Sequence, residues 1–171
     1  MELPPHEVHI LRAATGWLEL GDTAEALAEL EQLSQAAQQH PAVLETRWMI
    51  LAQNRDWATA ATVGGQLLAA APAYAAAWLH HAYALRRAPG GGLLAAYEAL
   101  RPAAERFPAE ATIPYNLACY TCQMQLDHAE TMAWLMQAIE RGGRKAIVSM
   151  ALNDADLAPL HAEIARLAKT A

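Results

Sequence analysis

Two cysteines, Cys119 and Cys122, are the residues whose type and spacing most directly suggest chemistry. Residues three positions apart lie on one side of a helix, so the two thiols could form a redox pair or part of a metal site. A zinc site needs two further ligands, and the chain has no second cysteine pair; the nearest histidine in the sequence is His128. Redox pairs usually stand at a helix N-terminus, whereas these residues fall in the middle of an expected helix. We therefore expect structural thiols and no metal or other cofactor, with a thiol- or metal-dependent protein as the alternative.

The other patterns that resemble catalytic or nucleotide-binding motifs favour structural roles. Pro89-Gly-Gly-Gly92 precedes an expected helix, but no Gly-Lys-Ser/Thr follows it, which favours an interhelical turn over a nucleotide loop. Asp154 and Asp156 resemble paired catalytic carboxylates, yet they open the last expected helix, where aspartate commonly acts as a cap. Ser34 and Ser149 are the only serines, and neither lies in a Gly-x-Ser-x-Gly motif. The sequence therefore predicts a protein that is not an enzyme.

The composition predicts a soluble, all-α protein. The chain has 171 residues, 54% of them hydrophobic and 18% charged, which is ample for a packed core. Few aromatic residues and many alanines favour closely packed helices over a β-sheet. A formal net charge of -6 argues against nucleic acid as a partner. The first residues lack a secretory signal pattern, and Pro72 interrupts the most apolar stretch, so we expect a cytoplasmic protein without a membrane segment.

A turn-and-helix pattern recurs along most of the chain. Asp22 and Asp56 begin two copies that are 34 residues apart. Ala96 follows its counterpart Ala60 after 36 residues, and Thr131 follows Ala96 after 35. Apolar residues inside each copy are spaced three or four apart, which is typical of helices. A period of this length predicts a solenoid of about four antiparallel helix pairs.

The expected helices pair as 7–20 with 23–39, 42–53 with 56–70, and 75–87 with 93–106. A fourth pair starts near residue 112, turns at Leu126-Asp127 and ends near residue 142. A short helix over 145–152 and a last helix over 154–169 are expected to cap the array. The polar outer face of this cap is expected to consist of Glu163, Arg166 and Lys169.

Several residues predict details of these helices. Gly21 and Asn54 should adopt the left-handed conformation at the first two turns. Pro102 should bend the helix 93–106, because it removes a backbone hydrogen bond. The helical spacing of the tryptophans to alanine and leucine favours core packing over stacking platforms. These tryptophans are Trp17, Trp48, Trp57, Trp78 and Trp134.

Over residues 7–142 the chain resembles tetratricopeptide-repeat proteins. Trp78 follows Pro72 at the spacing of the family's first helix, and Ala82 and Leu85 follow at later family positions. The stretch Ile113-Pro-Tyr-Asn-Leu-Ala-Cys-Tyr120 and the tail 151–160 are similar to small bacterial repeat proteins with no assigned activity. The resemblance implies one domain with a right-handed α-solenoid. Its repeats would span 7–40, 41–73, 74–108 and 109–142, with capping helices over 143–171.

In this family the first helices of successive pairs line a concave groove that holds a ligand. Asn116 is the best single candidate for such a contact, because an amide can pair with both the N–H and the C=O of a peptide; capping or bracing a neighbouring helix is the alternative. Arg86 and Arg87, with His80 and Tyr83, could clamp a carboxylate or could be a solvated helix end. The groove residues that the resemblance implies are Arg12, Thr15, Glu19, Glu45, Met49, Gln53, His80, Tyr83, Arg87, Asn116, Cys119 and Gln123.

The sequence therefore predicts a non-enzymatic adaptor or scaffold that binds a peptide or a partner helix on the concave face. The partner is expected to be a protein, and Glu19 and Glu45 leave open a basic segment at one end of the groove, with the arginines at the other. The family's own carboxylate clamp uses lysines where this chain has other residues, so that specificity is not transferred. Self-assembly into a homo-oligomer is a further alternative.

Overall fold

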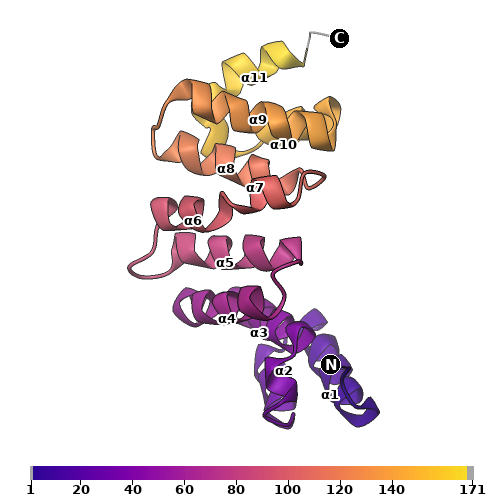
Figure 1. Cartoon of the computed structure of the whole chain (residues 1–171). Coiled ribbons are helices and arrows are strands. Elements are labelled where there is room, and N and C mark those ends of the chain that lie inside the picture. Colours follow the sequence, from indigo (N-terminus) through magenta and orange to yellow (C-terminus); the bar gives the residue numbers. More distant parts are fainter. Residues whose placement is uncertain (1, 169–171) are drawn as a thin grey trace. The chain divides into compact units, whose positions relative to one another are not determined.

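The chain is helical throughout the part that the structure describes. The computed structural model describes residues 2–168, and within that range it contains α-helices, short 3-10 helices and turns but no β-strand (Figure 1). The prediction of an all-α helical-repeat fold is confirmed. The chain divides into two compact units, Met1–Gly92 and Leu93–Ala171. The division falls inside the expected third repeat.

The first unit consists of helices that pack on their neighbours in sequence. Helix α1 packs against α2, α3 against α4, and α4 against α5. A 3-10 helix, η1, leads into α3. The bounds are α1 (Pro5–Glu19), α2 (Thr23–Glu31), η1 (Ala37–Gln39), α3 (Pro41–Gln53), α4 (Trp57–Ala70) and α5 (Ala75–Arg87).

Small side chains let α3, α4 and α5 approach closely. Ala60, Ala77 and Ala84 are fully buried in the core that these helices share. Gly64 lies where α4 meets α5, and a Cβ at this position would be only 2.9 Å from the Cα of His81. The high alanine content of the sequence thus corresponds to close helix contacts, as expected.

The prediction that the tryptophans pack in the core is confirmed for Trp48, which is 7% exposed and lies in the α3–α5 core, and Trp57 is partly buried against the same core. Trp17 is 37% exposed, and Trp57, Trp78 and Trp134 are partly exposed. The consequence is that tryptophan contributes to the surface of the protein.

Left-handed residues form the turns inside three helix pairs. The backbone φ angle is +84° at Gly21, as predicted, and +58° at Arg55 and +54° at Gln125. The prediction for Asn54 is wrong, because Asn54 remains right-handed with φ of -76° while its Oδ1 accepts a hydrogen bond from the Thr23 hydroxyl at 2.7 Å. Arg55 therefore makes the turn. Aspartate side chains cap the helices that follow these turns, Asp22 for α2, Asp56 for α4 and Asp127 for α9.

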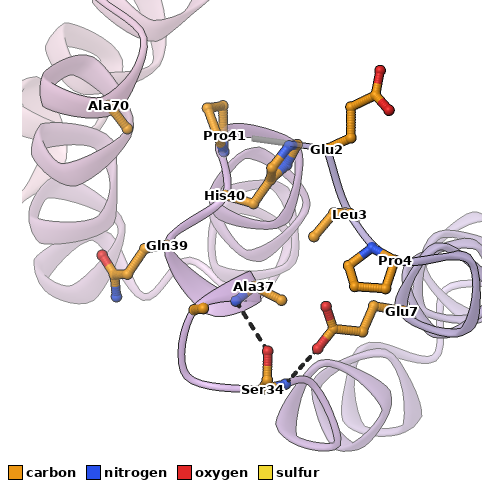
Figure 2. Close-up of a pocket in the computed structure, with 11 residues that line it drawn as sticks. Glu2, Leu3, Pro4, Glu7, Ser34, Ala37, Gln39, His40, Pro41 and Ala70 are labelled. Carbon is orange, nitrogen blue, oxygen red and sulfur yellow. Dashed lines mark hydrogen bonds between the residues drawn. The ribbon is translucent and has the colours of Figure 1, made fainter.

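Helix α2 ends at Glu31, not near residue 39 as predicted. The N–H of Ser34 donates to the carboxylate of Glu7 at 3.0 Å, and the Ser34 hydroxyl accepts from the N–H of Ala37 at 3.3 Å (Figure 2). Hydrogen bonds from the side chain and the backbone of Ser34 lower the pKa of Glu7, which is only 4% exposed. These contacts hold the chain in a turn, so only Ala37–Gln39 return to a helix, of the 3-10 type.

In the second unit, α8 is the helix that contacts most of the other elements. Helix α8 packs against α6, α7, α9 and η2, and α10 packs against α9 and α11. Pro102 was predicted to bend a helix over 93–106; the helix is instead interrupted there, between α6 and α7. The bounds are α6 (Leu93–Leu100), α7 (Ala103–Arg106), α8 (Thr112–Gln123), α9 (His128–Gly142), α10 (Arg144–Leu152), η2 (Ala155–Leu160) and α11 (His161–Leu167).

The last expected helix, 154–169, is interrupted. It begins as the 3-10 helix η2, which contains Pro159, and α11 starts only at His161. The side chain of Asp154 accepts the N–H of Asp156 at 2.9 Å, which confirms Asp154 as a cap. Leu157 and Ile164 are fully buried, so the segment forms part of the core. In the expected polar face, Arg166 is exposed and Glu163 is partly exposed, while Lys169 lies outside the described residues.

Candidate functional site

An aromatic cluster joins α3 and α5 on the surface of the first unit. The imidazole of His80 stacks on the indole of Trp48, with ring centres 4.0 Å apart and planes inclined by 20°. The ring of Tyr83 meets Trp48 edge-on at 6.2 Å and Trp57 at 5.7 Å. Such offset and edge-to-face contacts are attractive beyond simple burial. We call Trp48, Trp57, His80, Tyr83 and Arg87 the aromatic face.

Glu45 closes one end of the aromatic face. Its Oε1 accepts a hydrogen bond from the hydroxyl of Tyr74 at 2.7 Å and lies 3.4 Å from Nε2 of His80. The hydrogen bond to Glu45 raises the pKa of Tyr74. Burial lowers the pKa of His80, while the carboxylate of Glu45 opposes this shift. The imidazole therefore stays mostly neutral at pH 7 and can stack on Trp48 without a full charge.

Arg87 closes the other end. Its guanidinium carbon lies 3.5 Å from the centre of the Tyr83 ring and 5.4 Å from the Trp57 ring, which are cation–π contacts. Its Nη1 also donates to the backbone carbonyl of Tyr83 at 3.1 Å. Arg55, Trp57, Tyr83 and Arg87 line a hollow of about 410 Å³. This end of the face is thus cationic and aromatic.

The structure brings four of the sequence-predicted groove residues together in two pairs, Glu45 with His80 and Tyr83 with Arg87. Met49 is 36% exposed and Tyr83 is 39% exposed. The hydroxyl of Thr15 donates to the carbonyl of Leu11 in its own helix at 2.9 Å. Of the remaining candidates in the first unit, Arg86 is partly buried and three are exposed, namely Arg12, Glu19 and Gln53.

Sequence reasoning missed four residues at this site. Trp48 and Trp57 were assigned to the core alone and not to a binding surface, because an aromatic residue at helical spacing from leucine and alanine is usually buried. Tyr74 precedes α5, and Arg55 occupies a turn, so neither belongs to a first-helix face. The one available signal was composition, since tryptophan, tyrosine and arginine are enriched at binding surfaces.

In the second unit, the predicted groove residues of α8 already have partners. The side-chain amide of Asn116 donates to the carbonyl of Thr112 in its own helix at 2.8 Å. The amide of Gln123 donates to the backbone carbonyl of Asp156 at 2.8 Å, and the thiol of Cys119 lies 3.6 Å from Asp154. The residues before and within η2 therefore contact the α8 face that the resemblance assigns to the groove.

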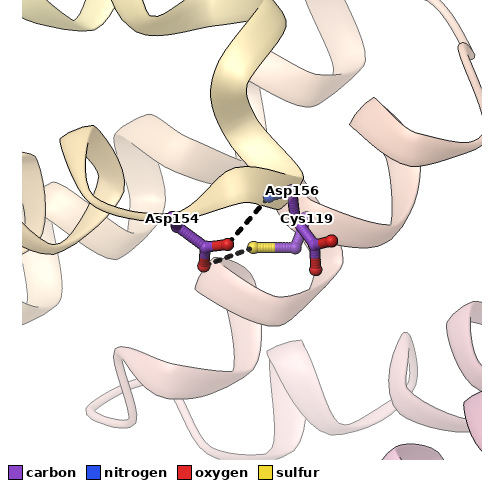
Figure 3. Close-up of side chains that lie close together, drawn as sticks. All are labelled: Cys119, Asp154 and Asp156. Atoms are coloured by element: carbon purple, nitrogen blue, oxygen red, sulfur yellow. Dashed lines mark hydrogen bonds between the residues drawn. The ribbon is translucent and has the colours of Figure 1, made fainter.

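Cys119 groups with two aspartates and not with Cys122. One possible ligand atom each from Cys119, Asp154 and Asp156 lie within 4.8 Å of one another, and Figure 3 shows the sulfur between the two carboxylates. Asp154 Oδ2 also accepts the hydroxyl of Tyr115 at 2.8 Å. Burial raises the pKa of the Cys122 thiol, which is the opposite of what a reactive cysteine needs. The hydrogen bonds that Asp154 accepts from Tyr115, Cys119 and Asp156 account for the grouping of the thiol with the two aspartates.

The glycine loop after α5 folds back on its own helix. The N–H of Gly91 donates to the carbonyl of Ala88 at 3.0 Å, and that of Gly92 donates to the carbonyl of Leu85 at 2.9 Å. Gly91 approaches the Leu85 carbonyl so closely that a Cβ would collide with it. Because these N–H groups cap the end of α5, the loop acts as the predicted interhelical turn.

Comparison with known proteins supports the fold. No protein-family model matches the sequence, and no curated protein matches it. A solved structure described as the MamA RS-1 ArsTM double mutant resembles it with a TM-score of 0.70 and 19% sequence identity, over 81% of this chain and 76% of that chain. MamA contains tetratricopeptide repeats. The chain therefore has a fold similar to tetratricopeptide repeats, and at this identity the likeness concerns the fold alone.

Among the described residues, no helix combines the length and the apolar character needed to cross a membrane.

Proposed function

We propose that the chain is a non-enzymatic protein-interaction module, an adaptor or scaffold, that holds a segment of another protein on the aromatic face. The observation that carries this proposal is a connected set of ring contacts: Trp48 contacts both His80 and Tyr83, and Tyr83 contacts Arg87. Tyr83 lies within this set and is 39% exposed. Tryptophan, tyrosine and arginine dominate the residues that contribute most to binding at protein interfaces.

The contacts within the aromatic face also favour binding because they fix the side chains in advance. Tyr83 is held by Trp48 and Trp57, and Arg87 is held by Tyr83. A side chain that is already ordered loses less entropy when a partner binds. Met49, exposed on α3, adds an apolar side chain that can adapt to a partner, and Tyr74, exposed before α5, adds a further aromatic ring.

A helix-pair repeat fold supports an interaction role, because stacked repeats present extended surfaces for other chains. The single domain and the binding role of Asn116 that the sequence predicts are finer parts of the proposal. A partner that contacts Asn116 would have to use its side chain in addition to the bond to Thr112. A partner that is confined to the aromatic face would not require it.

Capture by the purified full chain, followed by mass spectrometry of the retained proteins, tests the proposal. Retention should fall at least tenfold for Tyr83→Ala, because the variant removes the central exposed ring of the face. Met136→Ala on α9 is the matched control, since Met136 is also apolar and 41% exposed. Retention that survives Tyr83→Ala but is lost with Met136→Ala would contradict the proposal.

Self-association is the second outcome of the same experiment. If a tagged copy of the chain retains an untagged copy, and Tyr83→Ala prevents this, the face joins two copies of the protein. Sedimentation equilibrium of the wild type and of Tyr83→Ala would then show a dimer and a monomer, respectively.

A further inference from the structure

We infer that the bound segment is acidic and that one of its side-chain carboxylates enters the hollow between Arg55 and Arg87. The inference rests on the proposed function, because it specifies the chemistry of the segment that the aromatic face holds. The hollow has a volume of about 410 Å³ and is lined by Arg55, Trp57, Tyr83 and Arg87. Two arginines and two aromatic residues therefore line one small space.

Neither arginine has an ion-pair partner within residues 2–168. The guanidinium of Arg87 is nevertheless held in place by the Tyr83 ring and by the hydrogen bond to the Tyr83 carbonyl. Arg55 is exposed at a turn where its backbone is left-handed, with φ of +58°. An ordered guanidinium without a counter-ion binds a carboxylate through charge-assisted hydrogen bonds, often two at once.

The carboxylates near the hollow are engaged elsewhere. The side chain of Asp56 caps α4 by accepting the N–H of Thr59 at 3.2 Å, and Asp56 does not line the hollow. Glu45, at the other end of the aromatic face, accepts the hydroxyl of Tyr74. Neither carboxylate neutralises Arg55 or Arg87, so an anion supplied by the partner is the complementary charge.

The same contacts argue against the basic segment that the sequence left open. Glu45 was the expected acceptor for a basic side chain, but its Oε1 already contacts both Tyr74 and His80. Replacing these contacts by a lysine or arginine of the partner would leave the Tyr74 hydroxyl without its acceptor. The charged groups at this site that have no ion-pair partner among the described residues are therefore the cations of Arg55 and Arg87.

The rings of the hollow specify the neighbours of the acidic residue. Trp57 and Tyr83 line the hollow beside the arginines. An aliphatic or aromatic side chain next to the acidic residue would cover these rings while the carboxylate meets the guanidinium groups. The occupant is thus a peptide segment in which aspartate or glutamate adjoins an apolar residue.

Selection of random dodecapeptides on the immobilised full chain, followed by calorimetric titration of a selected peptide, tests the inference. We expect selected peptides to contain an acidic residue beside an apolar one. Affinity should fall about tenfold with Arg55→Gln and with Arg87→Gln, because each variant removes one charge-assisted contact. Arg87→Lys should retain part of the affinity, and Arg106→Gln on α7, where Arg106 is exposed, should not change it. Binding should also weaken as salt is raised.

The outcomes separate this inference from the proposed function. The selected peptides could instead be neutral or basic and lose affinity with Tyr83→Ala but not with Arg55→Gln or Arg87→Gln. That result would overturn the inference of an acidic partner, while the proposed binding role of the aromatic face would stand. Peptide binding that survives Tyr83→Ala, Arg55→Gln and Arg87→Gln would overturn both the acidic partner and the aromatic face as the binding surface. If millimolar inorganic phosphate binds with the same arginine dependence and no acidic peptide is selected, the hollow is a small-anion site and the inference is wrong.

Discussion

The carboxylate of Asp154 accepts hydrogen bonds from the Tyr115 hydroxyl at 2.8 Å, the Cys119 thiol at 3.6 Å and the N–H of Asp156 at 2.9 Å. Burial, and then the hydrogen bond to Asp154, raise the pKa of Tyr115 well above its ordinary value of 10. The hydroxyl therefore stays protonated at neutral pH and can donate to Asp154. One carboxylate thus joins α8 to the start of η2.

Replacement of Tyr115 by phenylalanine should lower the free energy of unfolding by about 1–3 kcal/mol, because a partly buried carboxylate loses a donor. Urea denaturation of the wild type and Tyr115→Phe measures the effect. Tyr74→Phe is the control, since it removes a similar bond to Glu45 at an exposed position and should cost less than about 1 kcal/mol. Equal losses would show that burial does not strengthen the Tyr115 bond.

Two histidines give the stability a pH dependence. Burial lowers the pKa of His80 and of His81 from their ordinary value of 6.5. The unfolded chain therefore binds more protons below pH 6.5 than the folded chain, so the stability is full above that value and decreases as the pH falls toward the folded pKa values.

Urea denaturation at about pH 7.5 and about pH 5.5 should show this loss, and His81→Gln should reduce it. His9→Gln is the matched control, because His9 is exposed and its removal should leave the loss unchanged. Glu7 does not interfere, since its lowered pKa makes stability depend on pH only below about its ordinary value of 4.5. A pH dependence that is the same in all three proteins would contradict the account.

The contact between α4 and α5 depends on one glycine of an adjacent pair. A Cβ at Gly64 would lie 2.9 Å from the backbone Cα of His81, whereas a Cβ at Gly65 would meet only the His81 side chain at 3.4 Å. Backbone cannot move without separating the helices, but a side chain can rotate. The two glycines therefore differ although they are neighbours in one helix.

Gly64→Ala should lower the free energy of unfolding by about 1–3 kcal/mol through this collision. Gly65→Ala should be neutral or should stabilise the protein by up to about 1 kcal/mol, because alanine favours the helix. Thermal denaturation of the two variants compares them directly. A stabilising Gly64→Ala would mean that α4 and α5 are farther apart than the structure shows.

Most helix positions could be predicted from signals in the nearby sequence. The helix ends that were predicted wrongly depend on contacts with residues far away in the sequence. Periodicity placed α5 at residues 75–87, and Pro102, from which a bend was expected, lies where the helix is interrupted between α6 and α7. The end of α2 was not predictable, because it depends on a bond from Ser34 to Glu7, 27 residues away in the sequence. The contacts of Asp154 with Tyr115 and Cys119 likewise span 39 and 35 residues. Such contacts arise from packing and leave no pattern in the sequence.

The candidate site was predicted in part. The resemblance placed Glu45, His80, Tyr83 and Arg87 on first helices, and the structure brings them together in pairs. The resemblance could not show that Trp48 contacts both His80 and Tyr83, because these contacts depend on how α3 packs on α5. The contacts of Cys119 and Gln123 with the residues before and within η2 were also hidden from the sequence.

The proposed binding surface lies in the first of the two units of the molecule. All residues of the aromatic face lie within Met1–Gly92, on α3, α4 and α5. In the second unit, the corresponding face of α8 contacts the residues before and within η2. The fold similarity to a tetratricopeptide-repeat protein applies to the chain, while the binding surface is a property of these particular side chains.

Site-specific photo-crosslinking tests the central claim most directly. A photoreactive phenylalanine in place of Tyr83 keeps an aromatic ring on the face, and the same group in place of Met136 on α9 serves as the equally exposed control. The account predicts a crosslinked partner from position 83, lost when Arg87→Glu is added, and none from position 136. Crosslinking from position 136 alone would show that the aromatic face is not the binding surface.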